Sequence, residues 1–116
     1  MSRFPARMFR GAAIYGVIVL APLYFMPLPR LGAEVMLGFT GLALVFQAVF
    51  WIIGGDPVKY RALMVPAIAE KLVFGVPALV LYTQGRTPAV LALFAAIDLA
   101  LAVGFAFALR HTPRQA

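Results

Sequence analysis

The sequence predicts an all-α integral membrane protein that folds as an antiparallel, up-down-up-down bundle of four transmembrane helices. Of its 116 residues, 64% are apolar and only 12% are charged, whereas soluble domains are about half apolar and about a quarter charged. Four apolar stretches are each long enough to cross a bilayer core, which takes about 20 residues at the rise of an α-helix. The connections between them are short, and short connections make sequential helices antiparallel neighbours.

The expected spans cover residues 8–27, 33–53, 62–83 and 88–109, so residues 1–116 should form one domain. An Arg-rich start before an apolar run is also typical of a signal peptide, but this run is longer than a signal's apolar region and no small-residue cleavage site follows it. We therefore expect the first span to stay in the protein. Between the second and third spans, Gly54-Gly55 predicts a helix end, and Asp56-Pro57 predicts a helix that begins at Pro57.

The basic residues at and beyond the ends of the spans predict the orientation. Seven of them flank the side with both termini and the middle loop, and two flank the other side. The positive-inside rule places the richer side in the cytoplasm, so we expect a bacterial inner-membrane protein with both termini cytoplasmic. The net charge of +6 does not indicate nucleic acid, because the basic residues are dispersed among loops. The expected partner is the lipid bilayer.

Few of the residue types that perform catalysis or bind metals are present. The sequence has no cysteine, one histidine (His111) and one serine (Ser2). Thiolate ligands, zinc and haem sites, and Ser-His or Cys-His nucleophiles therefore lack the side chains that they need. We predict no catalytic residue, no metal and no cofactor.

Charged residues inside the spans are the strongest indication of a site. Glu70 and Lys71 lie in the third span and Asp98 in the fourth, with the two acids about 12 and about 16 Å from the cytoplasmic edge at 1.5 Å per residue. Gln47 and Tyr15 fall in the same half, so every span contributes to the predicted polar cluster. A charge at a helix centre costs about 2.5–3.5 kcal/mol to insert, so these groups should face inward and pair.

The predicted cluster is not balanced in charge. Lys71 can pair with Glu70 or with Asp98, and two acids with one base leave a surplus negative charge. Either one carboxyl is protonated, or Arg10 or Arg110 reaches in, or the pocket takes up a cation or a proton. Buried Lys–carboxylate pairs also hold helices together without binding anything. A structural clasp, a ligand or ion site and a proton relay therefore all stay open.

Two prolines lie within the third span. Pro66 and Pro77 lack an N–H, so the carbonyls of Ala62 and Val73 lose their usual donors. In lipid, such carbonyls need another partner or a wet cavity, and the Val73 carbonyl should lie near the polar pocket. Prolines are also common and tolerated in membrane helices, which is the competing explanation.

Small residues recur at every fourth position of the last span. Such a stripe lets another helix backbone approach closely. At about 100° per residue it lies roughly opposite Asp98, so it should face outward, toward a second copy of the chain or another membrane protein. Alanine is abundant throughout, and chance composition is the alternative. The stripe consists of Ala92, Ala96, Ala100, Gly104 and Ala108.

Several segments of the sequence form a recognisable set: Ile14-Tyr15-Gly16, Asp56-Pro57-Val58-Lys59-Tyr60-Arg61, Pro66-Ala67, Glu70-Lys71, Gly75, Leu81-Tyr82-Thr83-Gln84-Gly85-Arg86 and Asp98. Together they resemble a group of small, uncharacterised bacterial four-span membrane proteins. The resemblance covers nearly the whole chain and implies the same fold, but no activity. In architecture alone, the bundle is similar to the DoxX-like and EXPERA bundles, the latter including sterol isomerases and sterol-binding receptors.

The favoured function is non-enzymatic, with the polar cluster lining a small pocket that binds a lipid-like or small amphipathic ligand. One alternative is a proton- or cation-coupled transporter that works as a homodimer. Another is a structural subunit that joins a larger membrane complex through the small-residue stripe. An isomerase in which a carboxyl moves a proton is less favoured, because nothing in the sequence indicates its substrate.

Overall fold

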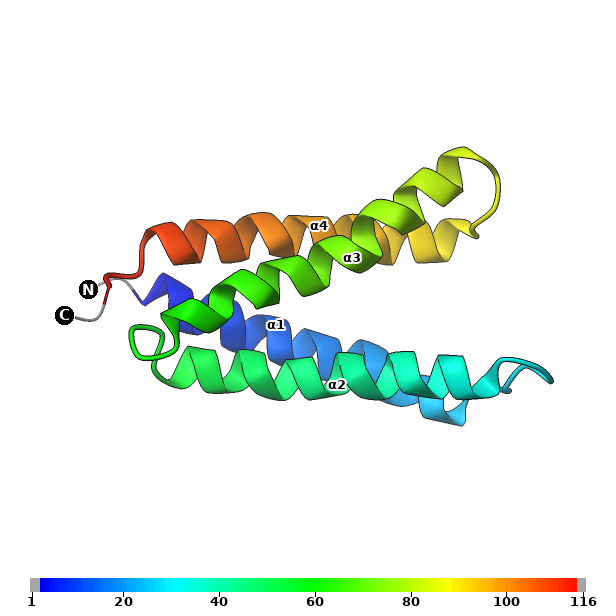
Figure 1. Ribbon diagram of the computed structural model, residues 1–116, viewed down its shortest axis with the longest axis horizontal. Helices are drawn as coiled ribbons and strands as arrows, with labels where there is room; N and C mark the ends of the chain where they lie inside the picture. The colour runs from blue at the N-terminus through cyan, green and yellow to red at the C-terminus, as the bar shows by residue number, and fades with distance from the viewer. Residues whose placement is uncertain (1–2, 115–116) are drawn as a thin grey trace.

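The computed structural model describes residues 3–114, which form α-helices joined by turns (Figure 1). The four long helices are α1 (Phe4–Leu20), α2 (Ala33–Gly55), α3 (Met64–Thr83) and α4 (Ala89–Arg110). Two short 3-10 helices, η1 (Ala21–Phe25) and η2 (Arg61–Leu63), adjoin α1 and α3. The described residues contain no strand, so the predicted all-α class is confirmed. With their 3-10 turns, the four helices are 22 or 23 residues long and apolar enough to cross a membrane.

The first helix differs from the expected span at both ends. It begins at Phe4 rather than at residue 8, because Pro5 lies in its first turn, where a missing N–H breaks no helical bond. At Ala21 it changes to the tighter 3-10 form of η1, which ends at Phe25. Pro22 lacks the N–H that would bond one turn back, which favours the end of regular α-helix at this point.

The prediction that the third helix begins at Pro57 is wrong. Residues 57–60 form a turn, in which the Lys59 backbone N–H donates to the Asp56 carboxylate at 3.3 Å. Tyr60 then leaves the helical conformation, with φ −103° and ψ 21°, and a single 3-10 turn follows. The α-helix starts only at Met64. Asp56 therefore caps a turn instead of a helix.

The two prolines of the third span have different positions in α3. Pro66 lies in the first helical turn, where an N–H would have no helical partner. Pro77 lies inside the helix, which continues to Thr83. Only Pro77 therefore removes a bond from the helix interior.

The helices form two pairs, which we call arms: α1 packs along α2, and α3 packs along α4. The contacts between the arms are fewer and run mainly from α1 to α4. Figure 1 shows both chain ends and the α2–α3 loop at the end where the arms meet, and the arms diverging toward the other end. The longest dimension is 51 Å, which exceeds the hydrocarbon core of a bilayer, about 30 Å, and also the whole bilayer, about 40–45 Å.

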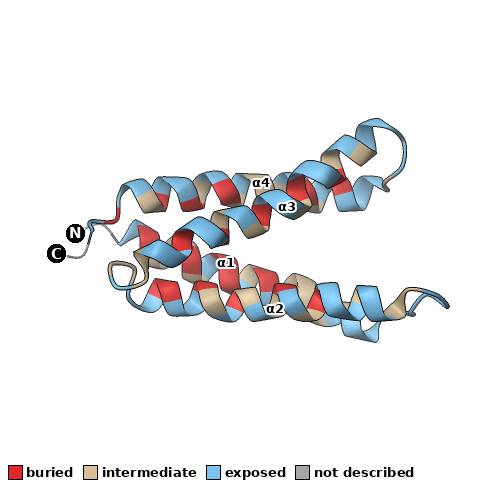
Figure 2. Cartoon of the chain, viewed as in Figure 1, coloured by how far each residue is buried: buried red, intermediate tan, exposed pale blue. Residues whose placement is uncertain are grey.

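Three phenylalanines form the core where the arms meet. Phe9 of α1 stacks on Phe105 of α4 with ring centroids 4.2 Å apart, and Phe50 of α2 meets Phe105 edge-to-face at 5.0 Å. All three are fully buried, and Met64 of α3 completes the cluster. Figure 2 shows buried residues where the helices face one another and exposed residues at the tips of the arms. Since each aromatic pair adds about 0.5–1.5 kcal/mol beyond its buried area, this cluster joins the arms at one end.

Within each arm, a glycine allows the two helices to approach closely. A Cβ added at Gly16 of α1 would overlap the side chain of Gln47 on α2. In the other arm, a Cβ added at Gly75 of α3 would lie 2.8 Å from the Leu99 side chain and 3.1 Å from the Ala95 carbonyl oxygen of α4. Small residues at helix contacts are typical of membrane bundles, because they let backbones come together.

The loop between the arms is tied to the end of α4 by Arg61. Its Nε donates to the Thr112 carbonyl at 2.8 Å, and its Nη2 donates to the Leu109 carbonyl at 3.3 Å. The last carbonyls of a helix lack helical partners and carry the negative end of the helix dipole, so a cation stabilises them. Arg61 therefore links the chain just before α3 to the C-terminal end of α4.

The prediction that the small-residue stripe of α4 faces outward is wrong for most of its length. Ala92 is 8% exposed, Ala108 is fully buried, and Gly104 is partly buried against α1. Only Ala96 and Ala100 are exposed. A four-residue step advances about 40° beyond a full turn of 3.6 residues, so the stripe winds by about 160° around the helix over its length.

The close contact at Gly75 predicts a loss of stability when one methyl group is added. Gly75→Ala should lower the free energy of unfolding by about 1–3 kcal/mol, because α3 and α4 must move apart. Gly11→Ala in α1 is the matched control, since nothing lies within 4 Å of a Cβ there. Unfolding of the purified protein in detergent, followed by circular dichroism, measures both. Equal stability of the two variants would contradict the close packing of α3 on α4.

Candidate functional site

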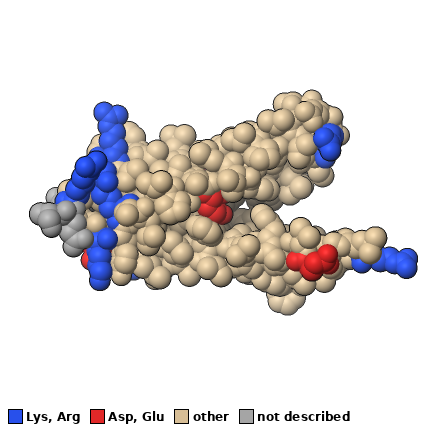
Figure 3. Space-filling view, viewed as in Figure 1, with Lys and Arg blue, Asp and Glu red and all other residues tan. Residues whose placement is uncertain are grey.

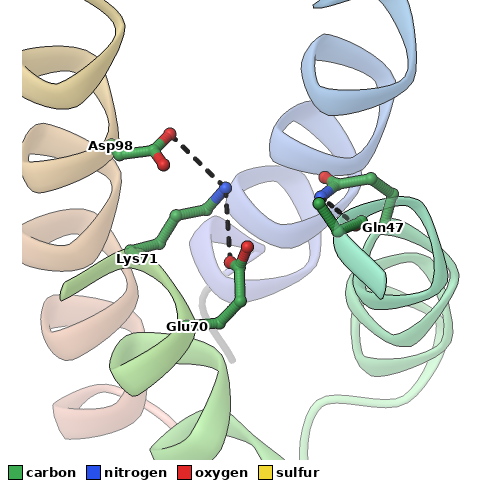
Figure 4. A network of polar contacts seen from close by, with 5 residues as sticks. Gln47, Glu70, Lys71 and Asp98 are labelled. Atoms are coloured by element: carbon green, nitrogen blue, oxygen red, sulfur yellow. Dashed lines mark hydrogen bonds and ion pairs between the residues drawn. The ribbon is translucent and has the colours of Figure 1, made fainter. Parts of the chain in front are cut away.

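Lys71 of α3 lies between the two acidic residues of the predicted cluster. Its Nζ is 3.5 Å from Glu70 Oε2 on the same helix and 3.6 Å from Asp98 Oδ1 on α4 (Figure 4). The Lys71 side chain is 4% exposed, compared with 16% for Glu70 and 17% for Asp98. The sequence left open which acid pairs with the lysine, and the structure brings it to both. We call these three residues the charged trio.

The crossing of α3 and α4 positions the trio. Gly75 lies four residues after Lys71 and thus on the same face of α3. Ala95, which contacts Gly75, lies three residues before Asp98 on the same face of α4. The close approach at Gly75 therefore brings Lys71 opposite Asp98.

The Lys71 ammonium also touches the aromatic core. Its Nζ lies 5.1 Å from the centre of the Phe50 ring on α2, within the range of about 6 Å for a cation–π contact. The ammonium is thereby in contact with groups from α2, α3 and α4. The trio consequently lies next to the aromatic cluster at which the two arms meet.

The trio carries a surplus negative charge. Within residues 3–114, Lys71 is the one cation that forms an ion pair with either acid. Arg10, which the sequence allowed as a second counter-charge, lies instead over the Trp51 ring, with its Cζ 4.2 Å from the ring centre. Arg110 ends α4 and is exposed. Two of the three explanations for the surplus charge remain: a protonated carboxyl, or a cation taken up by the site.

Two polar atoms at the site are buried and lack a hydrogen-bond partner in the described part of the chain. One is Glu70 Oε2, whose separation from Lys71 exceeds the usual N–H···O length of about 2.7–3.2 Å, so that contact is electrostatic. The other is the Tyr15 hydroxyl on α1. Buried polar groups are nearly always hydrogen-bonded in native proteins. These two atoms therefore indicate a place for a bound group.

The trio forms the floor of a cavity of about 160 Å³ between the two arms. Tyr15 adds a hydroxyl to this floor, and all four long helices contribute to the walls. The walls are aliphatic and aromatic, and Phe39, Phe74 and Phe94 are the aromatic ones. Figure 3 shows acidic atoms at the inner end of the gap between the arms. The cavity therefore combines a charged end with an apolar remainder.

A second hollow, which we call the side opening, lies between α2 and α3. It is lined by Phe39, Phe46, Val73 and Phe74, together with Glu70. Phe39, Phe74 and Glu70 line the main cavity as well, so the two hollows adjoin. Val73, whose carbonyl was expected near the polar pocket, lines the side opening and is 71% exposed as a residue.

The structure separates Gln47 from the predicted polar cluster. Gln47 is only 2% exposed, but its Nε2 donates to the Ala43 carbonyl of its own helix at 2.8 Å, and its amide packs against Gly16. Figure 4 shows it apart from the trio. Its surroundings fit a role in packing α1 on α2. Tyr15, the other predicted member, does line the cavity.

The aromatic walls are the part of the site that sequence reasoning missed. The sequence contains ten phenylalanines, distributed over all four spans. Phenylalanine is favourable both against lipid and inside a bundle, so residue type does not distinguish Phe39 or Phe94 from the others. No signal in the sequence could have selected them.

The donor groups of the site do not form a metal centre. No group of three or more His, Cys, Asp or Glu residues that could hold a metal ion occurs among residues 3–114. The trio includes an ammonium, which repels a metal cation placed beside it. The arrangement is suited to holding an ion pair next to an apolar cavity.

A comparison with protein-family models, with curated proteins and with solved structures found no match to this chain. The class of protein therefore rests on its fold and its site. The fold is all-α, with four helices long and apolar enough to cross a membrane. The site is a charged trio at the floor of a cavity between two pairs of helices.

The surplus charge predicts unequal effects when members of the trio are neutralised. Lys71→Met should lower the free energy of unfolding by about 3–5 kcal/mol, because two carboxylates are left buried without a counter-charge. Asp98→Asn should have a much smaller effect, because Lys71 then balances Glu70. Thermal unfolding in detergent measures both variants. The opposite order of stability would show that the two acids do not hold Lys71.

Proposed function

We propose that this chain is an integral protein of a bacterial inner membrane, with four antiparallel spans and with both termini and the α2–α3 loop in the cytoplasm. The length and hydropathy of the helices support the spans. Figure 3 supports the orientation, because most Lys and Arg side chains lie at the end where the chain termini are found. The positive-inside rule assigns this basic end to the cytoplasm. The arms then diverge toward the periplasm.

Fusions to reporter proteins test this orientation. Green fluorescent protein fused after Ala116 should fluoresce, and alkaline phosphatase at the same position should be inactive, because its disulfides form only in the periplasm. Phosphatase inserted after Gln84, in the α3–α4 connection, should be active. Active phosphatase after Ala116 would overturn the assignment.

We propose further that the protein is non-enzymatic and that its cavity binds a lipid-like or small amphipathic ligand. The observation that carries this proposal is the charged floor beneath apolar walls within one cavity. Ligand sites are typically concave and mostly apolar, with a few polar groups that orient the ligand. A polar head would meet the trio and Tyr15, and the attached chain would lie against the aliphatic and aromatic walls.

The size of the cavity limits what it encloses. Its volume of about 160 Å³ is close to that of an engineered apolar cavity, about 150 Å³, that takes up one benzene molecule. The cavity therefore holds a head group and a few carbons. The rest of a longer ligand must extend along the gap between the arms, past Leu23 and Leu91, which line the same cavity.

A purely structural clasp explains the site less well. Buried ion pairs that only join helices are stabilised when hydrogen bonds satisfy their remaining atoms. Here Glu70 Oε2, which has only the electrostatic contact with Lys71, and the Tyr15 hydroxyl are buried without a hydrogen-bond partner in the described part of the protein, and both residues line a cavity. A ligand head placed in the cavity supplies partners for these atoms.

Filling the cavity should weaken ligand binding. Ala43 lines the cavity, and Ala43→Phe should reduce labelling by a photoreactive monoacylglycerol by about 10-fold or more, because the ring occupies the ligand's space. Ala48→Phe, on the exposed side of the same helix, is the matched control and should be labelled like the wild type. The measurement is labelling in lipid nanodiscs as a function of probe concentration.

A second filling variant, Leu91→Trp, reaches the cavity from α4 and should have the same effect as Ala43→Phe. Thermal unfolding of each variant shows whether it is folded. Equal labelling of the wild type and both filling variants would exclude the cavity as the binding site.

A further inference from the structure

Glu70 is the charged residue that lines both the main cavity and the side opening, whereas Lys71 and Asp98 line the main cavity alone. Glu70 Oε2 is buried and accepts no hydrogen bond from any described residue. The hydroxyl of Tyr15, which lines the same cavity from α1, is also buried without a hydrogen-bond partner in the described part of the chain. The cavity is thus lined by two oxygen atoms that can still accept a hydrogen bond, beside a surplus negative charge.

We propose that the ligand of the cavity is an amphiphile whose head is a protonated amine, that this head donates hydrogen bonds to Glu70 and Tyr15, and that it enters from the bilayer through the side opening. This inference rests on the proposed function and names the class of ligand for the same cavity.

The balance of charge is the first argument. Lys71 neutralises one of the two acids, and a ligand ammonium neutralises the other, so the occupied site is uncharged overall. A carboxylate or phosphate head would instead add to the surplus negative charge in a region where an unpaired charge is costly. An uncharged head would leave the surplus in place.

The hydrogen-bonding capacity of the floor is the second argument. An ionised carboxylate only accepts hydrogen bonds, and a phenol oxygen accepts as well as donates. A primary ammonium offers three donors and no acceptor, so it complements both Glu70 Oε2 and the Tyr15 hydroxyl. A quaternary ammonium has the charge without the donors. The site should therefore prefer the amine.

The walls are the third argument, because they distinguish an organic cation from an inorganic one. Phe39, Phe74 and Phe94 line the same cavity as the trio, and aromatic faces attract ammonium groups. Calcium takes six to eight oxygen ligands, and magnesium requires nearly ideal octahedral coordination. Residues 3–114 contain no cluster of three candidate metal ligands. The attached hydrocarbon chain also gains from the apolar walls, which a bare ion does not.

The side opening provides the route by which the ligand enters the cavity from the bilayer. α2 and α3 belong to different arms and make few contacts with each other. The opening between them is apolar except for Glu70, which lies where it joins the main cavity. An amphiphile that moves within the bilayer can thus keep its chain in apolar surroundings, and Glu70 is the first charged group that its head reaches.

Competition among four ligands with the same dodecyl chain tests the inference. Dodecylamine, dodecyltrimethylammonium, dodecanol and dodecanoate are each used to displace the photoreactive monoacylglycerol from the wild-type protein. Nanodiscs of neutral phosphatidylcholine are used, and concentrations are expressed as mole fractions in the lipid, so that attraction to the membrane surface does not imitate binding. Dodecylamine should displace the probe at a mole fraction about 10-fold lower than dodecanol and should also surpass dodecyltrimethylammonium.

Two variants and one control locate the effect. Glu70→Gln should remove the preference for dodecylamine while dodecanol still competes, which also shows that the variant is folded. Tyr15→Phe should raise the mole fraction of dodecylamine needed to displace the probe by a few fold, as expected for one lost hydrogen bond. Glu34→Gln removes the same formal charge from the exposed first turn of α2, and it should keep the full preference for the amine.

Equal competition by dodecylamine and dodecanol in the wild type would overturn the inference and leave the proposed function intact, because a neutral amphiphile would still bind. An equal loss of the preference for dodecylamine over dodecanol in Glu34→Gln and Glu70→Gln would also overturn it. If dodecyltrimethylammonium displaced the probe at the same mole fraction as dodecylamine, the hydrogen-bonding role of the head would be disproved. Failure of all four ligands to displace the probe would refute both the inference and the proposed function.

Discussion

The buried ammonium of Lys71 is the interaction on which the rest of the arrangement depends. A cation that is 4% exposed must find its stabilising partners within the protein, and these come from three helices. Glu70 is next to it on α3, Asp98 faces it from α4, and the Phe50 ring meets it from α2. A shift of any of these helices along its axis would leave the charge without a partner. One side chain thus constrains the register of three helices.

The cavity follows from the contrast between the two ends of the molecule. At one end the aromatic cluster of Phe9, Phe50 and Phe105 holds the arms together. Farther along, the contacts at Gly16 and Gly75 hold each arm together internally, and the tips of the arms are exposed. The arms therefore separate beyond the aromatic cluster, near the level of Lys71. The trio is left at the boundary, with packed side chains on one side and a cavity on the other.

Polar residues in apolar spans could be singled out from the sequence by type, but their partners could not. Glu70, Lys71 and Asp98 were expected to meet because an unpaired charge is costly in lipid, and the structure places them within ion-pair distance. Gln47 gave the same kind of signal, yet it packs against Gly16. Its Nε2 donates to a carbonyl of its own helix, and its buried Oε1 has no hydrogen-bond partner among the described residues. The depth of a residue follows from counting, whereas the direction of its side chain depends on how the helices rotate.

The sequence by itself determined the helices and the groups that had to be turned inward. Apolar length sets the number of helices, because a bilayer core requires a fixed length of helix. The prolines did not mark the helix ends in the same way: the expected first span ran through Pro22, and Pro77 lies inside α3. Only the tertiary structure decided that there is a cavity, which phenylalanines line it, and that Glu70 lies at its side opening. These features depend on the angle between two arms, which is set by contacts between residues as distant in the chain as Phe9 and Phe105. A phenylalanine is favourable both against lipid and in a cavity wall. Its position in the sequence therefore does not predict which of the two it faces once the angle between the arms is set.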